Sequence, residues 1–252
     1  MPVVETLVNA LIRGIVQLLC TVHGSELNRI PRKGPAIWVT NHTTNLEGPI
    51  YYVLTDPRRK TALGKQELWR NPVTRFIMQL WGVIPLNRRG ADRRAMQRAR
   101  RVLERGDFLG IAPEGTRSMS GRLQRGRPGA AMIATAANVP IYPMVQWGIG
   151  DLVQNLRRLR KTHLHFRVGN PFYLHVPEGR APKPAELRQM ADEIMYQLAV
   201  LLPPRLRGYY RDLSAMTTEF IRPAGGLYHG ASDLVGYGSS DGRRRPATDR
   251  KE

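Results

Sequence analysis

The sequence predicts an α/β fold, with one domain in which a mostly parallel central sheet is flanked by helices, and with an added N-terminal amphipathic helix. Short apolar runs bounded by turn residues, which are typical of buried strands, alternate along the chain with segments of helical periodicity. The length of 252 residues suits one domain with appendages and is sufficient to bury a sizeable core. A hydrophobic share of 42% and a charged share of 23% exclude overall disorder.

The first predicted element is a helix over residues 3–22. Its polar residues Glu5, Asn9, Arg13 and Gln17 recur every four positions and form one stripe, while apolar side chains take the rest of the circumference. Either this helix packs on its own domain or it lies in a membrane interface. No apolar run reaches the ~20 residues that span a bilayer, and the segment makes a poor signal peptide because it lacks a basic start.

Turn residues divide the following part of the chain into alternating strands and helices. Several predicted helices carry their own boundary signals, such as Pro72 at a start and Gly82 and Gly106 at ends. The predicted strands are residues 36–40, 83–86, 107–113, 140–148 and 164–172. The predicted helices are residues 45–54, 72–82, 91–106, 128–138 and 184–202.

Three units follow from this pattern. Residues 1–23 form the N-terminal helix, residues 24–221 form the domain, and residues 222–252 form a basic tail. The tail is rich in Gly, Ser and Arg and has no apolar periodicity, which predicts disorder.

The chain is strongly basic, with 39 Lys+Arg against 20 Asp+Glu and a net charge of +19. Most of this charge belongs to the folded part, so an anionic partner is expected: nucleic acid, an anionic membrane surface or a phosphorylated substrate. Against nucleic acid, aromatic residues make up 7% and no RNP-like block or zinc-finger spacing occurs, although pattern alone leaves a helix-turn-helix open. The single cysteine, Cys20, excludes an internal disulfide framework and a cysteine-based zinc cluster.

The segment NHTTNLEGP, residues 41–49, is the first candidate for chemistry. His42 follows a predicted strand, and Glu47 falls in the first turn of the next helix. A carboxylate that accepts the Nδ1 proton of His42 would leave Nε2 free as a general base. The alternative is a surface histidine beside a helix-capping glutamate.

Two further strand ends carry charged residues. In PEGTRS, residues 113–118, Arg117 can hold a phosphate through two hydrogen bonds and Gly115 lets the backbone approach a ligand. In VIPLNRR, residues 83–89, a strand delivers Arg88 and Arg89. Taken singly, an ordinary turn and solvated arginines explain these segments. Because the carboxyl ends of parallel strands meet at one edge of a sheet, the three segments are expected to converge there.

The order of these segments resembles the glycerolipid acyltransferase superfamily, the group typified by bacterial 1-acylglycerol-3-phosphate acyltransferase. The resemblance extends from about residue 34 to about residue 210. The similar blocks are Asn41-His42 with the carboxylate of Glu47, KQEL with NP over residues 65–72, GVIPLNR over 82–88, FLGIAPEGTRS over 108–118 and VPIYP over 139–143. The family's carboxylate is Asp, so Glu47 is a departure.

The resemblance implies an O-acyltransferase of phospholipid biosynthesis. His42 would be the general base and Glu47 its orienting carboxylate, with a free hydroxyl of a glycerol-phosphate-type acceptor attacking the thioester of acyl-CoA or acyl-carrier protein. The implied substrate-binding residues are Lys65, Arg88 and Arg117 around the acceptor phosphate, Glu114, Gly115 and Thr116 in the acceptor pocket, and Pro140 with Pro143 on the acyl side. No metal or other cofactor is expected, because a base and correct positioning suffice for an activated thioester.

The default acceptor is 1-acylglycerol-3-phosphate. Glycerol-3-phosphate, another lysophospholipid and an unphosphorylated alcohol are the alternatives within the enzyme class, and a catalytically silent membrane-binding relative is the alternative outside it. The resemblance favours the interfacial interpretation of residues 3–22. It implies a peripheral protein on the cytoplasmic face of the cell membrane that binds an anionic membrane surface and no nucleic acid.

Overall fold

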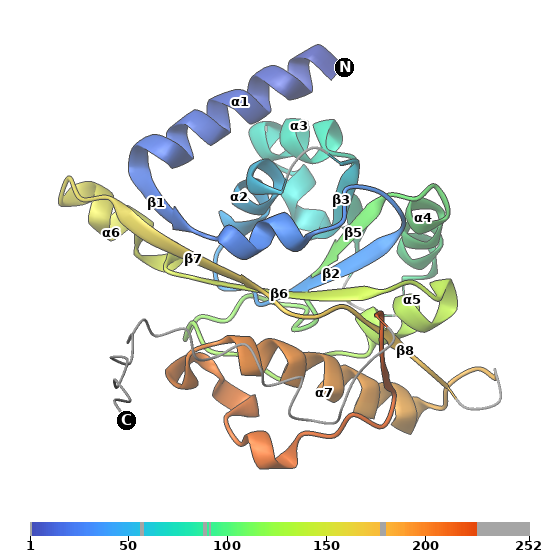
Figure 1. The fold of residues 1–252 in the computed structure, drawn as a ribbon. Coiled ribbons are helices and arrows are strands. Elements are labelled where there is room, and N and C mark those ends of the chain that lie inside the picture. The colour runs from blue at the N-terminus through green and yellow to red at the C-terminus, as the bar shows by residue number, and fades with distance from the viewer. Residues whose placement is uncertain (1, 56–57, 88–89, 91, 177–179, 226–252) are drawn as a thin grey trace, which may run out of the picture.

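A single mixed sheet organises the part of the chain that the computed structural model describes, namely residues 2–55, 58–87, 90, 92–176 and 180–225 (Figure 1). Within these residues the sheet contains nine strands. They are β1 (Cys20–His23), β2 (Ala36–Thr40), β3 (Lys60–Lys65), β4 (Ile84–Leu86), β5 (Phe108–Ile111), β6 (Ile141–Trp147), β7 (Thr162–Val168), β8 (Phe172–Leu174) and β9 (Ile221–Pro223). The helices are α1 (Pro2–Leu19), α2 (Glu47–Leu54), α3 (Pro72–Leu80), α4 (Arg93–Glu104), α5 (Gly129–Ala137), α6 (Leu152–Arg157) and α7 (Pro184–Leu201).

The centre of the sheet is parallel. Strands β6, β2, β5, β3 and β4 lie side by side in that order and run in one direction. On the far side of β6, β7 runs antiparallel to it, and β1 pairs in parallel with β7. The mostly parallel sheet predicted from the alternating pattern is therefore confirmed, and the strand ends after β2, β4 and β5 lie along one edge.

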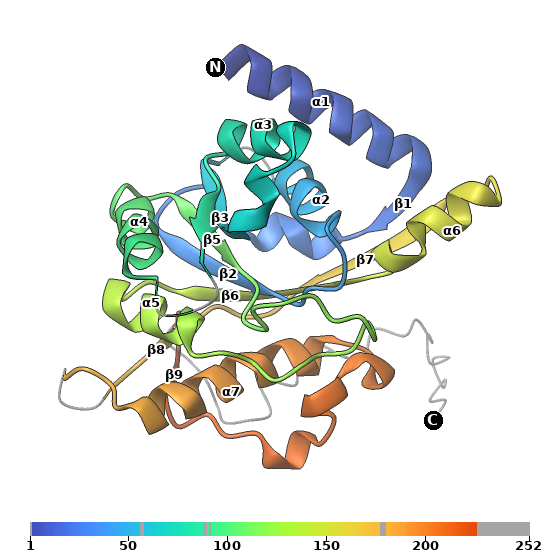
Figure 2. The ribbon, with the colours of Figure 1, turned by 180° about the vertical axis from the view of Figure 1, so that it is seen from behind.

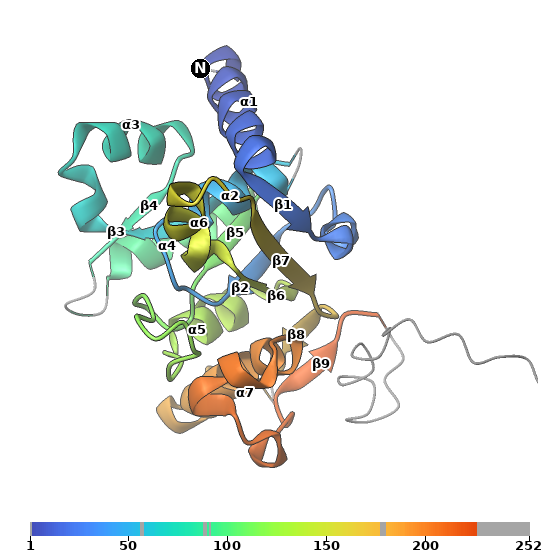
Figure 3. The same ribbon diagram turned by 90° about the vertical axis from the view of Figure 1, so that its left-hand side faces the viewer.

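Helices cover the sheet on both faces. Helices α1, α2 and α3 lie on one side and α7 on the other (Figure 3). On the α7 side, α5 contacts α4 and α7 (Figure 2) and buries Ala130, Ala131 and Ala134, whose small side chains allow close packing. On the opposite side, Trp38 and Phe108 belong to a separate apolar cluster beneath α1 and α2.

The N-terminal segment differs from the prediction in two respects. Helix α1 ends at Leu19, and Cys20–His23 continue as β1, which pairs with β7. The predicted helix over residues 3–22, and the unit 1–23 built on it, are thus too long at the carboxyl end. The partner of β1 comes from about 140 residues further along the chain, which local periodicity does not report.

Three residues of the polar stripe of α1, Glu5, Asn9 and Arg13, point toward the domain together with the buried Val16, whereas Gln17 is exposed. Glu5 Oε1 accepts a hydrogen bond from Tyr52 Oη at 2.8 Å. Asn9 Oδ1 accepts one from Trp81 Nε1 at 3.0 Å, and Arg13 donates to the carbonyl of Val53 at 2.8 Å. The other face of α1 is therefore left outward, and it is apolar. The exposed residues are Val3, Val4, Leu7, Leu11, Ile15 and Leu18.

Two smaller boundaries also differ. The strand predicted over residues 164–172 is two strands, β7 and β8, because Gly169 turns the chain and Pro171 has no backbone N–H to donate to a ladder. Arg222 and Pro223 fall in β9, which pairs with β8, so the ordered chain continues past the predicted boundary at residue 221. The remaining predicted tail, from residue 226 onward, lies outside the described residues.

Candidate active site

His42 and Glu47 form a hydrogen-bonded pair just beyond the carboxyl end of β2. His42 Nδ1 lies 2.7 Å from Glu47 Oε2. Since a carboxylate has no proton to give, Nδ1 donates and Nε2 carries the lone pair. The Glu47 side chain is 3% exposed, whereas that of His42 is 23% exposed. The pair predicted from spacing alone is present in the structure, with the histidine turned toward solvent and the carboxylate buried behind it.

Glu47 is held by a second set of donors on its other oxygen. Oε1 accepts from the backbone N–H groups of Thr43 at 2.6 Å and Thr44 at 2.7 Å, and from Gln146 Nε2 at 2.8 Å. Glu47 begins α2, so its longer side chain folds back over the turn that leads into the helix. The glutamate therefore reaches His42 while staying anchored to the turn, which explains how it can occupy the aspartate position.

Asn41 and Gln146 join the β2 strand end to β6. The side chain of Asn41 donates to the carbonyl of Gln146 and accepts from its N–H, each at 2.9 Å. Gln146 is 0% exposed and lies within an otherwise apolar strand. Neither residue was assigned a role from the sequence. The sequence signal that could have identified Gln146 was a polar residue within a predicted buried strand, because a buried polar side chain requires a hydrogen-bonding partner.

Glu114 fastens the PEGTRS turn to the backbone of His42. Its Oε1 accepts from His42 N–H at 2.9 Å, and its Oε2 accepts from Gln124 N–H at 2.8 Å. In return, Ser118 N–H donates to the His42 carbonyl at 2.7 Å. Burial raises the pKa of Glu114 against the lowering effect of these hydrogen bonds. Glu114 is 2% exposed and therefore positions the backbone of His42 from behind. This differs from the expectation that its side chain lies in the acceptor pocket.

Replacing Glu114 with Ala is expected to lower the free energy of unfolding by about 2–4 kcal/mol, because the buried N–H groups of His42 and Gln124 lose their acceptor. Urea denaturation monitored by circular dichroism measures this loss. A loss below about 0.5 kcal/mol, the range of ordinary surface substitutions, would contradict the proposed role of Glu114 in holding His42 and Gln124.

The pH dependence gives an independent check on Glu114. A carboxyl whose pKa is raised in the folded state stabilises the fold most below its unfolded pKa of about 4.3, and this stabilisation is lost as the pH rises through the raised value. The stability advantage of the wild type over Glu114→Gln should therefore shrink as the pH rises from about 4 to 7. An advantage that grows with pH would contradict the burial effect.

An apolar cavity of about 330 Å³ opens beside His42 and Glu47. Trp38 lies along it, directly over Gly110, where an added Cβ would come within 2.3 Å of the indole ring. The cavity is within the size range of ligand pockets, and its mainly apolar lining includes the polar residues Thr40, His42, Glu47, Asn87 and Asp92. Further lining residues are Tyr51, Ala62, Leu63, Leu86, Met96, Ile111, Met132 and Ile133.

A cationic residue at this cavity, Arg127, was not predicted. Arg127 lines the cavity together with Gly115, whose φ of +70° and lack of a Cβ leave room for the arginine stem; an added Cβ would lie 2.7 Å from Arg127 Cδ. Arg117 and Thr116 follow in the same turn but are not among the cavity-lining residues. The signal that could have identified Arg127 was its place just before the predicted Ala-rich helix.

The remaining predicted binding residues fall in three places. Lys65 ends β3 beside Leu86, at the same sheet edge as His42 but outside the cavity lining. Arg88 lies outside the described residues, although its neighbour Asn87 lines the cavity. Pro140 precedes β6 at the opposite edge, where its carbonyl accepts from Ile37 N–H at 2.9 Å.

The prediction that Pro140 lines the acyl side is therefore wrong. By strand rise, Pro140 lies roughly 15–20 Å from the level of His42. Pro143, in the middle of β6, packs against Gly169 and does not line the cavity either. Pro140 precedes β6 and Pro143 lies within it, and the same strand carries Gln146 to the site. The two prolines are therefore part of the strand that supports the site and not of the cavity lining.

Comparison with known proteins agrees with this geometry. The family model described as Acyltransferase matches residues 20–147, just over half of the chain. A chloroplastic 1-acyl-sn-glycerol-3-phosphate acyltransferase of Brassica napus is 31% identical over 121 residues, covering 47% of this chain and 35% of that protein. A 1-acyl-sn-glycerol-3-phosphate acyltransferase of Borreliella burgdorferi is 29% identical over 157 residues, covering 62% and 59%.

A solved structure has the same fold. The crystal structure of the 1-acyl-sn-glycerophosphate acyltransferase from Thermotoga maritima superposes with a TM-score of 0.55 at 22% identity, covering 76% of each chain. The present chain spans 35% and 59% of the length of the two curated relatives named above.

Proposed function

This chain belongs to the acyltransferase family, and from that premise we propose that it transfers a fatty acyl chain from an acyl thioester to the free hydroxyl of 1-acylglycerol-3-phosphate. The observation that carries the proposal is the His42–Glu47 pair in the lining of an apolar cavity. The relatives' names support the acceptor, and the cavity supports a long aliphatic chain as the transferred group.

In the proposed reaction, His42 Nε2 takes the proton of the acceptor hydroxyl while the oxygen attacks the thioester carbonyl. The protonated imidazole is stabilised by the Glu47 carboxylate on Nδ1. When the tetrahedral intermediate collapses, the C–S bond breaks and the proton passes from His42 to the departing thiolate. The new ester and a free thiol are the products, and the thioester's own reactivity makes a metal unnecessary.

The acceptor phosphate needs a cationic contact near His42. Arg127 lines the cavity and is our first candidate, with Arg117, Lys65 and Arg88 as the residues implied by the family resemblance. The donor is proposed to be acyl-CoA or acyl-carrier protein, both of which present the acyl group as a thioester on the same phosphopantetheine arm.

The test is thiol release from a long-chain acyl-CoA or acyl-carrier protein by the full chain, with lysophosphatidate in mixed micelles and glycerol-3-phosphate as the competing acceptor. Lysophosphatidate-dependent release with formation of phosphatidate supports the proposal. A preference for glycerol-3-phosphate would move the acceptor to the alternative within the class. No release with either donor and either acceptor would favour a silent membrane-binding relative.

We also propose that α1 holds the protein peripherally on the cytoplasmic face of the cell membrane. Its polar stripe is hydrogen-bonded to the domain, so its outward apolar face has no protein partner in the described part of the chain. Leu7 and Leu11 are each 65% exposed and Leu18 is 70% exposed. Among the residues described, no helix has the length and apolar character needed to cross a bilayer. A helix of this kind suits the lipid interface.

Replacing Leu7 and Leu11 with Ser is expected to weaken binding to phosphatidylglycerol-containing vesicles at least tenfold, because burying a leucine side chain is worth roughly 1.5–3 kcal/mol. Vesicle co-sedimentation of the full chain measures the effect. Leu156→Ser/Leu159→Ser, which removes two exposed leucines outside α1, is the matched control and should bind like the wild type. Equal vesicle binding by the double variant and the control would contradict the proposal that α1 lies in the lipid interface.

A further inference from the structure

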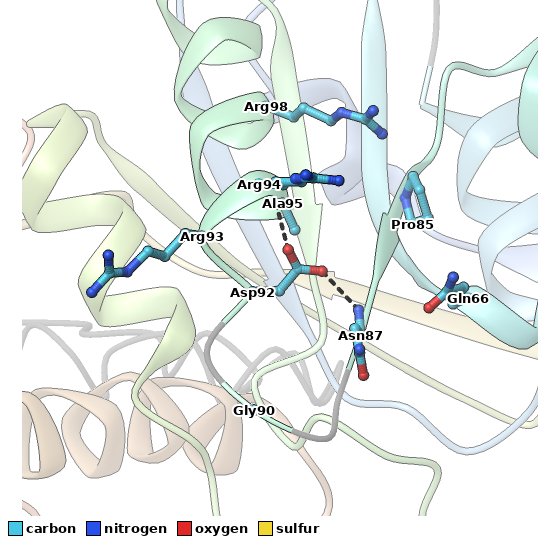
Figure 4. Close-up of a pocket in the computed structure, with 9 residues that line it drawn as sticks. All are labelled: Gln66, Pro85, Asn87, Gly90, Asp92, Arg93, Arg94, Ala95 and Arg98. Carbon is cyan, nitrogen blue, oxygen red and sulfur yellow. Dashed lines mark hydrogen bonds between the residues drawn. The ribbon is translucent and has the colours of Figure 1, made fainter.

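A second, basic pocket of about 560 Å³ lies beside the cavity at His42. One wall is the start of α4, with Arg94 and Arg98, and the other is formed by Gln66 and Pro85. Figure 4 shows Arg94 and Arg98 one above the other, one helical turn apart, and extending toward the Pro85 side, while Arg93 points away from them. Arg94 and Arg98 are both exposed, and both line the same pocket.

The neighbouring carboxylate of Asp92 interacts electrostatically with Arg98 but offsets only part of the charge of this pocket, which is also lined by Arg93 and Arg94. Asp92 accepts hydrogen bonds from the N–H groups of Asn87 at 2.9 Å and Ala95 at 3.0 Å, which lower its pKa and fix it as the cap of α4. Within the described residues, neither Arg94 nor Arg98 lies within 4.0 Å of a carboxylate. Two cations on one wall therefore remain available for an anion.

The basic pocket adjoins the cavity at His42, because Asn87, Gly90 and Asp92 line both. A donor whose reacting end lies at His42 could therefore place its other end in the basic pocket. A thioester at His42 would have its acyl chain in the apolar cavity and the rest of the donor outside it. In acyl-CoA, that remainder is a pantetheine arm ending in a nucleotide with a diphosphate and a 3′-phosphate.

We propose that the pocket formed by Arg94, Arg98 and Gln66 binds the phosphates of the CoA nucleotide of the donor. Guanidinium groups bind phosphate oxygens through paired, charge-assisted hydrogen bonds. A hollow of about 560 Å³ is large enough for a nucleotide, and the side chains of Arg94 and Arg98 suit the phosphates of one. The inference rests on the proposed acyltransferase function and assigns CoA as the donor.

The first experiment needs no catalysis. Adenosine 3′,5′-bisphosphate is titrated into the full chain by calorimetry, using wild type, the double variant Arg94→Gln/Arg98→Gln, and the control Arg100→Gln/Arg101→Gln. The control removes the same charge from the same helix outside the pocket lining. We expect binding to weaken about tenfold or more in the pocket variant and to be unchanged in the control. No binding to the wild type, or equal weakening in both variants, would overturn the proposal.

The second experiment identifies which substrate the pocket serves. The pocket variant should raise the KM for acyl-CoA about tenfold or more and leave the KM for lysophosphatidate and for acyl-pantetheine unchanged. A raised KM for lysophosphatidate alone would assign the pocket to the acceptor phosphate, and a loss confined to acyl-carrier protein would assign it to a protein surface; either result overturns the proposal. Nucleotide binding without any acyl transfer would instead refute the proposed function and leave the pocket standing.

Discussion

Replacing His42 with Ala is expected to reduce kcat for acyl transfer by about 10²–10⁴-fold, the usual contribution of a positioned general base. The acceptor hydroxyl would then have to attack with its proton still bound, or lose it to bulk water. KM for the donor should change little, because the apolar cavity that takes the acyl chain is lined mainly by other residues. Initial rates of thiol release at saturating acceptor give the comparison.

The expected loss comes from the imidazole and not from unfolding. His42 is partly exposed, its backbone keeps the contacts with Glu114 and Ser118, and Glu47 keeps the donors of Thr43, Thr44 and Gln146 when the imidazole is removed. The thermal midpoint of His42→Ala should therefore stay close to that of the wild type. His23→Ala, on β1 and away from the cavity lining, is the matched control and should keep full activity. A His42→Ala enzyme that retains more than about a tenth of kcat would exclude His42 as the base.

Replacing Glu47 with Ala is expected to produce the second large effect, a fall in kcat of about 10²–10³-fold together with reduced stability. Without the carboxylate, His42 is free to take the other tautomer, and its protonated form is no longer stabilised. The N–H groups of Thr43 and Thr44 and the Gln146 amide also lose their acceptor. Kinetics and urea denaturation on the same preparation separate the two effects.

Glu47→Asp distinguishes an adapted glutamate from an impaired one. In this backbone the carboxylate bridges His42 Nδ1 on one oxygen and the 43–44 turn on the other, and a side chain shorter by one methylene cannot keep both contacts at 2.6–2.7 Å. We therefore expect activity to fall several-fold, by roughly 1 kcal/mol of transition-state stabilisation. A clear gain in kcat would mean that glutamate impairs the site and that aspartate restores it.

Local patterns were sufficient for much of the fold. The alternation of apolar runs with helical periodicity predicted β2, β4, β5 and β6 and the helices α2 to α5 and α7 near their observed bounds. The strands share one direction because helical crossovers return the chain to the same edge of the sheet. That rule also predicted that the strands leading to His42, to Arg88 and Arg89, and to Glu114 end at one edge. The strands β2, β4 and β5 do so, although Arg88 and Arg89 themselves lie outside the described residues.

The pairing of His42 with Glu47 was likewise accessible from the sequence, because five residues and one helix start decide it. The partners that hold the pair were not. Gln146 and Glu114 reach the site from 99 and 72 residues away, and a contact of that range leaves no periodic trace in the local sequence. The position of Pro140 at the opposite edge of the sheet was also not predictable from its motif. A motif gives the residue types but not the edge of the sheet at which each residue lies.

The sequence by itself determined that α1 has a polar stripe and apolar residues around it; the tertiary structure decided that most of the stripe faces the protein, beside the buried Val16, and that most of the large apolar side chains face outward. Burying the apolar face is the usual arrangement, and it would have left the outward side polar. Here Tyr52, Trp81 and the carbonyl of Val53 supply hydrogen-bonding partners to Glu5, Asn9 and Arg13, so the polar stripe is satisfied against the domain. The orientation depends on those partners, which are brought into place only when α2 and α3 have folded onto the sheet.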